Sequence, residues 1–388
     1  MKFFLRFTLL ILAPCAIFQP LGMDIFVSGI PRMIDSLKLT EQSIQYLLII
    51  FMIASSLPQL IMGPLSDKYG RKPLIIIGSF GFALTSLLCT TTHNLPLLVL
   101  YRFFQGLAAS TCLVVIYAII RDTYYGRASS KMYSYISCVL ALTAMLAPFI
   151  GAMIMDAFNT WEATFYSLAL FALFALIMVS ITLPETHIKQ VRTKQKTFSI
   201  AVIKAVLSNR TFLTYTLSPT ITMTGLFLYF SIGSILLMDV LHLSSYDYSL
   251  LFGMNACFYF VGNYLSALLL NRLNIKTIVI LGNICLFLGP LCMIGLNLVF
   301  GLSVVGIVFS NSITTLGGGL LVGPAVSAAL EPFEDNAGSA SGVLGAIQYG
   351  VPALVGYFAT RAEFTSTLPL ALPILLLSII NFWILKSE

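Results

Sequence analysis

The chain has 388 residues, of which 58% are hydrophobic and only 9% are charged. A soluble domain carries about a quarter charged residues, so this chain has too few polar groups to cover a surface in water. The composition excludes an ordinary soluble domain and predicts an all-α membrane protein whose solvent is lipid. The net charge of +6 then indicates an uneven distribution of charge among loops, not a nucleic-acid-binding surface.

The cysteines and histidines argue against a metal site. No two cysteines sit at a metal-ligand spacing, and none lies in a polar loop suited to a disulfide framework, so we interpret all seven as small apolar fillers. They are Cys15, Cys89, Cys112, Cys138, Cys257, Cys285 and Cys292. The histidines, His93, His187 and His242, lie far apart in the sequence. We therefore predict no metal ion and no cofactor.

The first apolar run could be mistaken for a signal peptide, because Lys2 and Arg6 precede it. Pro14-Cys15 also hints at a lipoprotein cleavage site. However, no small-residue cleavage site follows, and the run continues to about Val27. A helix of about 20 residues crosses the ~30 Å hydrocarbon core of a bilayer. We interpret Phe7–Val27 as a retained first membrane helix.

Twelve apolar spans of this length are predicted along the chain. They cover Phe7–Val27, Ile44–Met62, Pro73–Thr91, Leu97–Ile120, Met132–Met155, Ala163–Leu183, Phe212–Leu237, Tyr248–Leu270, Thr277–Leu298, Ser303–Leu330, Ala340–Thr360 and Leu368–Leu385. The longest polar segment, Pro184–Arg210, separates the sixth span from the seventh. The predicted organisation is an N-terminal six-helix bundle at residues 1–184, a basic cytoplasmic linker at 185–210 and a C-terminal six-helix bundle at 211–388.

Charge asymmetry predicts the orientation, because cytoplasmic loops of membrane proteins carry an excess of Lys and Arg. If both termini are cytoplasmic, 17 of the 21 Lys and Arg residues face the cytoplasm. Only Arg32, Lys38 and Arg361 then lie outside, and Arg102 falls within a span. We predict a multi-pass protein of a bacterial-type inner membrane with both ends inside.

A compact polar segment between the second and third spans, Gly63–Lys72, reads Gly-Pro-Leu-Ser-Asp-Lys-Tyr-Gly-Arg-Lys. About ten residues is an ordinary length for a connection between antiparallel helices, and a solvated basic loop is the simplest interpretation. The order of residue types nevertheless resembles the loop 2–3 signature of the major facilitator superfamily. The matching residues are Gly63, Leu65, Asp67, Gly70, Arg71 and Lys72. The resemblance implies two pseudo-symmetric six-helix bundles with a substrate site near the midplane between them.

Two ionisable residues within the spans are candidates for proton coupling, since a charge inside a bilayer is costly. Asp24 lies near the outer end of the first span and Arg102 in the outer half of the fourth, so a direct or water-bridged pair is possible. A helix-end role for Asp24 and a purely structural role for Arg102 are the alternatives. Arg102, Gln105 and Gly106 resemble the family's helix 4 signature, which is associated with proton coupling.

The fifth span contains Ala147-Pro-Phe-Ile-Gly151-Ala, which resembles the antiporter signature through Pro148 and Gly151. Further motifs are similar to those of the Bcr/CflA-type drug:proton antiporters. They are Met23-Asp-Ile-Phe, Arg102–Ala109, Ile120-Arg-Asp122, Ser218-Pro219 and Ala337–Ser341. This resemblance implies a cytoplasmic charge cluster that stabilises the outward-open state and breaks as the halves rock. Its expected members are Asp67, Arg71, Arg121 and Asp122.

Polar residues within other spans are candidates for the substrate cavity. Asn255, Tyr259 and Asn263 recur every four residues, so they share a helical face that lipid would penalise. The other candidates are Gln19, Gln59, Gln105, Tyr229, Asn311, Gln348 and Tyr349. For each one, a hydrogen bond between helices is the alternative role. The glycine-rich Gly317–Pro324 lacks the Lys-Ser/Thr ending of a nucleotide-binding loop, so a gradient is expected to drive transport.

Together these observations predict a secondary transporter, not an enzyme. We expect it to export amphipathic small molecules in exchange for protons by alternating access (multidrug efflux), with Asp24 as the protonation site and Arg102 modulating it. Its expected partners are substrate, protons and lipid, with no nucleic acid, and a monomer is expected. Two alternatives stay open: a carrier of one endogenous metabolite such as a siderophore or amino-acid derivative, and a membrane-embedded sensor or assembly protein without transport.

Overall fold

A computed structural model describes residues 2–25, 29–38, 41–186, 200–243, 245–333, 336–359 and 366–386. These residues form helices and connecting turns, with no strand in any of the described ranges. Half of the predicted basic linker, residues 187–199, lies outside them. The all-α fold class predicted from the sequence is confirmed.

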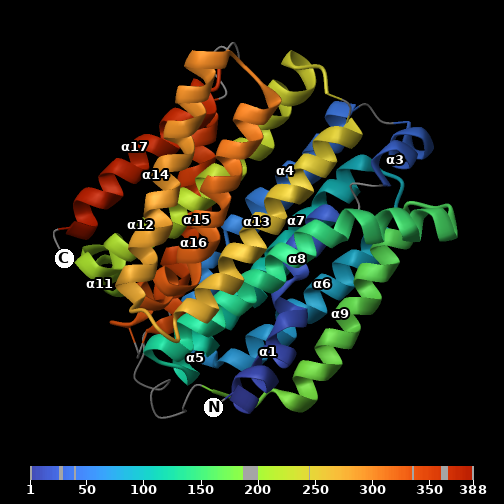
Figure 1. The fold of residues 1–388 in the computed structure, drawn as a ribbon. Coiled ribbons are helices and arrows are strands. Elements are labelled where there is room, and N and C mark those ends of the chain that lie inside the picture. The colour runs from blue at the N-terminus through green and yellow to red at the C-terminus, as the bar shows by residue number, and fades with distance from the viewer. Residues whose placement is uncertain are drawn as a thin grey trace. The chain divides into compact units, whose positions relative to one another are not determined.

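The helices belong to two compact units (Figure 1). Unit 1 comprises Met1–Thr123, Leu142–Lys204 and Phe333–Ala346, and unit 2 comprises Tyr124–Ala141, Ala205–Pro332 and Ile347–Glu388. Two long helices contribute to both units: α8 (Gly126–Phe158) and α16 (Ala337–Ala359). The first half of each therefore packs in a different unit from the second half.

The remaining helices of unit 1 are α1 (Lys2–Ala16), α2 (Phe18–Asp24), α3 (Ile30–Leu37), α4 (Glu41–Ser56), α5 (Gln59–Tyr69), α6 (Arg71–Cys89), α7 (Leu95–Thr123) and α9 (Glu162–Thr182). The short α11 (Ile200–Ser208) follows. Unit 2 contains α12 (Arg210–Leu228), the π-helical turns η2 (Tyr229–Gly233) and η3 (Ile235–Val240), α13 (Ser245–Leu269), α14 (Ile275–Phe300), α15 (Val304–Leu330) and α17 (Leu368–Lys386).

Two predicted spans are interrupted by proline. The first divides into α1 and α2 at Ile17, because Pro20 has no N–H to donate to the carbonyl of Ala16 and its ring clashes there. The second divides into α4 and α5 at Leu57 and Pro58 for the same reason. The predicted ten-residue loop Gly63–Lys72 is wrong: α5 continues to Tyr69 and α6 begins at Arg71.

Gly70 makes the whole turn between α5 and α6. Its φ of 104° lies in a region that side chains with a Cβ rarely adopt, so glycine is needed there. Consequently the charged residues of the signature lie on helix ends, not in a loop. That placement fixes their side chains more firmly than a solvated loop would.

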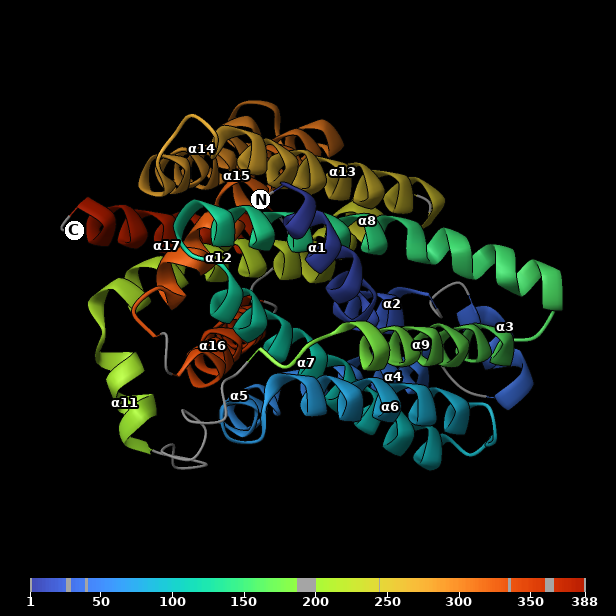
Figure 2. The ribbon, with the colours of Figure 1, turned by 90° about the horizontal axis from the view of Figure 1, so that it is seen from below.

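Unit 1 packs α6 between α7 and α9, as Figure 2 shows. The Phe18 and Phe82 rings stack with centroids 4.7 Å apart. Deeper in the same unit, the Ser79 hydroxyl lies 3.5 Å from the Cys15 thiol and 3.7 Å from the Cys112 thiol. The thiols fill the core as small residues, in keeping with their predicted role.

Unit 2 packs α15 against α12, α13 and α14 (Figure 1). Glycines bring α14 and α15 into backbone contact, since a Cβ on Gly282 would lie 2.7 Å from the Gly317 carbonyl oxygen. Three fully buried polar side chains join α12, α14 and α17: Asn381 donates to Ser218 Oγ at 2.8 Å and to Asn283 Oδ1 at 2.6 Å. Such bonds tie helices together where lipid offers no alternative partner.

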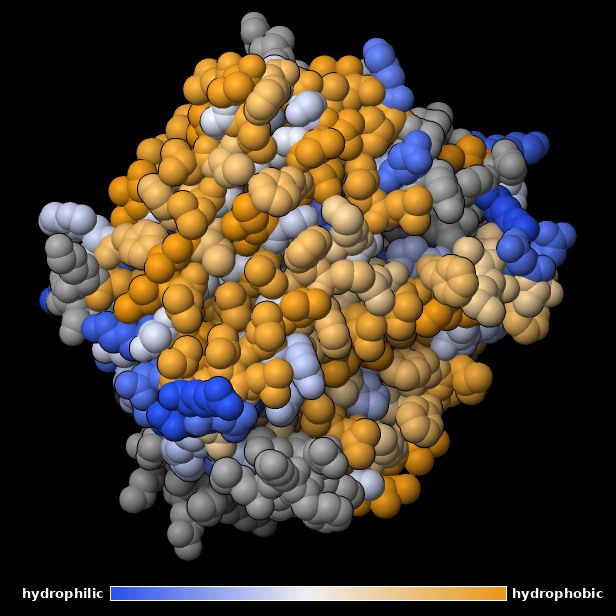
Figure 3. Space-filling model, viewed as in Figure 1, coloured by the Kyte–Doolittle hydropathy of each residue, from blue (hydrophilic) through white to orange (hydrophobic). Residues whose placement is uncertain are grey.

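The surface and the helix lengths suit a membrane. Eight helices of the described residues are long and apolar enough to cross one, and Thr8–Asp24 is a shorter apolar helical stretch. On the face shown in Figure 3, apolar side chains form a broad surface and hydrophilic ones lie at its margins. The count of twelve spans and the cytoplasmic termini stay predictions.

Candidate functional site

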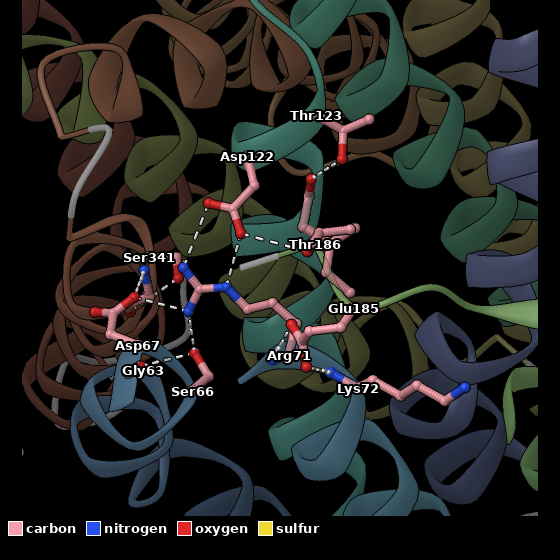
Figure 4. A network of polar contacts seen from close by, with 12 residues as sticks. Gly63, Ser66, Asp67, Arg71, Lys72, Asp122, Thr123, Glu185, Thr186 and Ser341 are labelled. Carbon is pink, nitrogen blue, oxygen red and sulfur yellow. Dashed lines mark hydrogen bonds and ion pairs between the residues drawn. The ribbon is translucent and has the colours of Figure 1, made fainter. Parts of the chain in front are cut away.

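A buried charge cluster connects the ends of α5, α6 and α7 (Figure 4). The Arg71 guanidinium is fully buried and donates through Nη1 to Asp67 Oδ1 at 2.7 Å and through Nε to Asp122 Oδ2 at 2.9 Å. Arg71 Nη1 also donates to the Ser66 hydroxyl at 2.6 Å. One cation thus pairs with two carboxylates, and all three side chains are largely buried. This is the charge-assisted geometry in which hydrogen bonds are strongest.

Asp67 also holds the start of α16. Its Oδ1 accepts from the Gly338 backbone N–H at 2.9 Å, and its Oδ2 accepts from the Ser339 N–H and the Ser339 hydroxyl, both at 2.8 Å. The first N–H groups of a helix have no partner within the helix, and the helix dipole favours an anion there. Asp67 therefore joins α16 to α5 through three hydrogen bonds to a carboxylate.

Glycines allow this approach of α5 and α16. A Cβ on Gly63 would lie 2.0 Å from the Gly338 carbonyl oxygen, and one on Gly342 would lie 2.1 Å from the Gln59 carbonyl oxygen. A Cβ on Gly345 would lie 1.5 Å from Gln59 Oε1. All of these contacts lie within unit 1. We call this set, with the bonds of Asp67, the α5–α16 contact.

Glu185, just beyond α9, caps the start of α6. Its carboxylate accepts from the backbone N–H of Arg71 at 3.0 Å and of Lys72 at 3.3 Å. Lys72 in turn donates to the Ser180 carbonyl at 2.8 Å. Glu185 was not predicted as a site residue, although an acidic residue at the start of a basic linker is a detectable signal. It stabilises the backbone that carries Arg71.

Arg102 is fully buried in α7. Its Nη1 donates to the Gly22 carbonyl at 2.8 Å and to Gln105 Oε1 at 2.8 Å, and its guanidinium lies 4.5 Å from the centre of the Phe51 ring. Gln105 then donates to the Ser86 hydroxyl at 2.6 Å. Carbonyl oxygens and the π face of Phe51 thus interact with this cation.

Asp24 ends α2, two residues after Gly22, and is partly buried. Among the described residues, the ion pairs do not include a direct one between Asp24 and Arg102, and the predicted coupling of the two residues, direct or through water, stays a prediction. The Arg102 guanidinium donates to the Gly22 carbonyl and to Gln105. Arg102 is therefore bonded to the backbone of α2 two residues before Asp24.

The predicted cavity residues of unit 2 form a hydrogen-bonded network. Asn255 Nδ2 donates to the Tyr229 hydroxyl at 3.1 Å, and Asn255 Oδ1 accepts from Asn311 at 3.0 Å and from the Ser312 hydroxyl at 3.5 Å. Asn263 donates back to the Tyr259 carbonyl at 2.9 Å. The network joins α13, α15 and η2. Ser312 was not predicted, since a serine in an apolar span carries a weak signal.

The other predicted residues lie in several environments. Gln59, Gln348, Tyr259 and Arg121 are buried, while Gln19 and Tyr349 are partly exposed. Pro148 is exposed and Gly151 buried on α8. The structure thus brings together Asp67, Arg71 and Asp122, and separately Arg102 with Gln105. The roles of all these residues stay predictions.

Comparison with known protein families identifies the family of this chain. A family model described as Major Facilitator Superfamily matches residues 12–357. The chain therefore belongs to the Major Facilitator Superfamily, as the Gly63–Lys72 signature predicted. The fold agrees, because the chain is similar to two solved members at low identity.

One of these structures is the human organic anion transporter MFSD10 (TETRAN), with a TM-score of 0.76, 16% identity and coverage of 98% of this chain and 99% of that one. The other is the proton:xylose symporter XylE, with a TM-score of 0.73, 14% identity and coverage of 98% and 94%. At such identities the likeness concerns the fold.

Bacterial relatives in sequence carry names that refer to drug resistance. The chain is 26% identical to a bicyclomycin resistance protein homolog of Haemophilus influenzae, over 98% of this chain and 96% of the relative. It is 27% identical to the multidrug resistance protein MdtL of Klebsiella pneumoniae, over 85% and 82%. It is also 28% identical to the uncharacterized transporter YdgK of Bacillus subtilis, over 89% and 85%.

These findings confirm the predicted resemblance to bacterial multidrug transporters of the Bcr/CflA type. The chain is a multi-pass membrane protein of a transporter superfamily, and a location in the inner membrane is consistent with its bacterial relatives.

Proposed function

We propose that this transporter exports amphipathic small molecules in exchange for protons. The observation that carries the proposal is the match, along nearly the whole chain, to relatives named for resistance to bicyclomycin and to multiple drugs. The buried network of amides and a phenol around Asn255, with the Phe252 ring stacked against Tyr229, suits a ligand with polar and apolar parts. No cofactor is needed, because the proton gradient supplies the energy.

Alternating access is the proposed mechanism, and the α5–α16 contact is its proposed switch. While Asp67 holds the start of α16, Gln59 and Gly63 on α5 stay in contact with Gly342 and Gly338. When these bonds break, α16 is free to leave α5. Helix α16 continues into unit 2, so breaking these bonds frees a helix that contributes to both units.

Asp24 is the proposed proton site and Arg102 its proposed modulator. The Gly22 carbonyl, held by Arg102, fixes the last turn of α2 and therefore the position of the Asp24 backbone. A carboxylate at this position exchanges a proton when its surroundings change from wet to apolar. Substrate and proton then bind alternately, which couples the two fluxes.

Asp24→Asn is expected to abolish proton release when cationic compounds are added to proteoliposomes, because the amide accepts no proton in this pH range. The measurement compares a pH-sensitive dye inside vesicles that hold wild type or variant. Asp156→Asn is the matched control, since this carboxylate on α8 is largely exposed. Equal responses in wild type and Asp24→Asn would show that a residue other than Asp24 carries the proton.

A carrier dedicated to one metabolite is the alternative outcome of the same assay. Drug export predicts proton release with several unrelated amphipathic compounds that compete with one another. A response restricted to one chemical family of compounds would indicate dedicated metabolite transport and not drug export.

A further inference from the structure

Four cationic side chains gather at one end of unit 2, where α8 begins and where α13 is connected to α14. Arg127 and Lys131 lie one turn apart on α8, and Arg272 and Lys276 flank the connection. Arg127 Nη2 donates to Asn274 Oδ1 at 3.0 Å, and Lys131 Nζ donates to Asn271 Oδ1 at 2.5 Å. These bonds hold the start of α8 beside the connection, and Arg272 and Lys276 follow Asn271 and Asn274 by one and two residues. We call these four residues the basic cluster.

The positive charge of the basic cluster is not neutralised by an ion pair within the described residues. Both hydrogen-bond acceptors are neutral amides, and no carboxylate forms an ion pair with any of the four cations in the part of the chain that the structure describes. Arg71 in unit 1 differs, because Asp67 and Asp122 balance it. Cations that lie close together without an anion repel one another, so an added anion would be stabilised there.

The surface next to the basic cluster is apolar. Val261, Leu265 and Leu268 on α13 are exposed and lie four and three residues apart, so they form one stripe along the helix. Arg272 follows four residues later in the turn that ends α13. Arg127, Arg272 and Lys276 are themselves exposed. An apolar stripe that ends at a cluster of cations matches a lipid, whose acyl chain and anionic headgroup are arranged in the same way.

We propose that the basic cluster binds the phosphate headgroup of an anionic phospholipid, whose acyl chain lies along the α13 stripe. Basic pockets between membrane helices on the cytoplasmic side are suited to anionic headgroups. Arg127 and Lys131 are positioned in advance by Asn274 and Asn271, so little side-chain order is lost on binding. The bound lipid then contacts both α8 and the turn between α13 and α14.

The test measures the thermal unfolding of the purified full chain in neutral detergent as phosphatidylglycerol is added, because a ligand of the folded state raises the unfolding temperature. Phosphatidylglycerol is expected to stabilise the wild type, and phosphatidylcholine or inorganic phosphate to have little effect. Arg127→Gln with Lys131→Gln is expected to weaken the apparent affinity roughly 30-fold, from two lost phosphate contacts. Equal stabilisation by phosphatidylcholine, or by inorganic phosphate, would overturn the proposal.

Two further variants separate binding from folding. Lys68→Gln with Lys204→Gln removes the same charge from unit 1 and is expected to keep the wild-type affinity. Asn271→Asp with Asn274→Asp keeps all four cations but supplies carboxylates to Lys131 and Arg127, and is expected to weaken lipid binding while the protein stays folded. If either the glutamine or the aspartate pair keeps full affinity, the cluster is not the lipid site.

Discussion

Arg71→Met is expected to abolish transport and to lower the free energy of unfolding by about 3–5 kcal/mol, because it leaves the carboxylates of Asp67 and Asp122 buried without a cation. The methionine fills most of the volume, so the loss is electrostatic and not a cavity effect. Thermal unfolding in detergent and uptake by proteoliposomes measure the two consequences. A variant as stable as the wild type would show that water or another cation balances the carboxylates.

The triple variant Asp67→Asn, Arg71→Met, Asp122→Asn is the control for this result. It removes all three charges, and neutral replacements of a buried ion cluster are often as stable as the original. We expect its stability to return close to that of the wild type while transport stays lost, because a neutral amide binds the start of α16 less strongly than a carboxylate does. Recovery of transport would contradict the proposed role of the cluster in switching.

The sequence predicted the all-α fold, because long apolar runs are a local signal of membrane helices. It missed the helical character of Gly63–Tyr69, because the glycines and charged residues of Gly63–Lys72 suggested a loop. Tertiary contacts outweigh that local preference: Ser66, Asp67 and Gly63 are all buried. A polar segment that is buried by its neighbours cannot be distinguished from an exposed one by composition.

Side-chain partners of the charged residues were predicted from the sequence, whereas their backbone partners were not. The resemblance to known transporters implied that Asp67, Arg71 and Asp122 form a cluster, and the structure brings them together. It gave no indication that Asp67 accepts from N–H groups of Gly338 and Ser339, because backbone donors have no sequence signature. For the same reason, nothing in the sequence indicated that Arg102 donates to the carbonyl of Gly22.

Gly342→Ala is expected to open the α5–α16 contact, because the added methyl would lie 2.1 Å from the Gln59 carbonyl oxygen. That oxygen belongs to the backbone of α5, so it has little freedom to move aside. As α16 shifts away, the Gly338 and Ser339 N–H groups lose Asp67, and each hydrogen bond to a charged group is worth about 1.5–3 kcal/mol. Loss of even one such bond corresponds to roughly a tenfold shift toward the open contact.

Hydrogen exchange measures this shift directly. We expect the amides at the start of α16 to exchange roughly tenfold faster or more in Gly342→Ala than in the wild type, with reduced transport. Gly350→Ala is the matched control on the same helix, because nothing lies within 4 Å of its added methyl. Its exchange and transport are expected to match the wild type. If both alanines behave alike, the helix propensity of alanine explains the effect, and the close approach of α16 to Gln59 does not control the transporter.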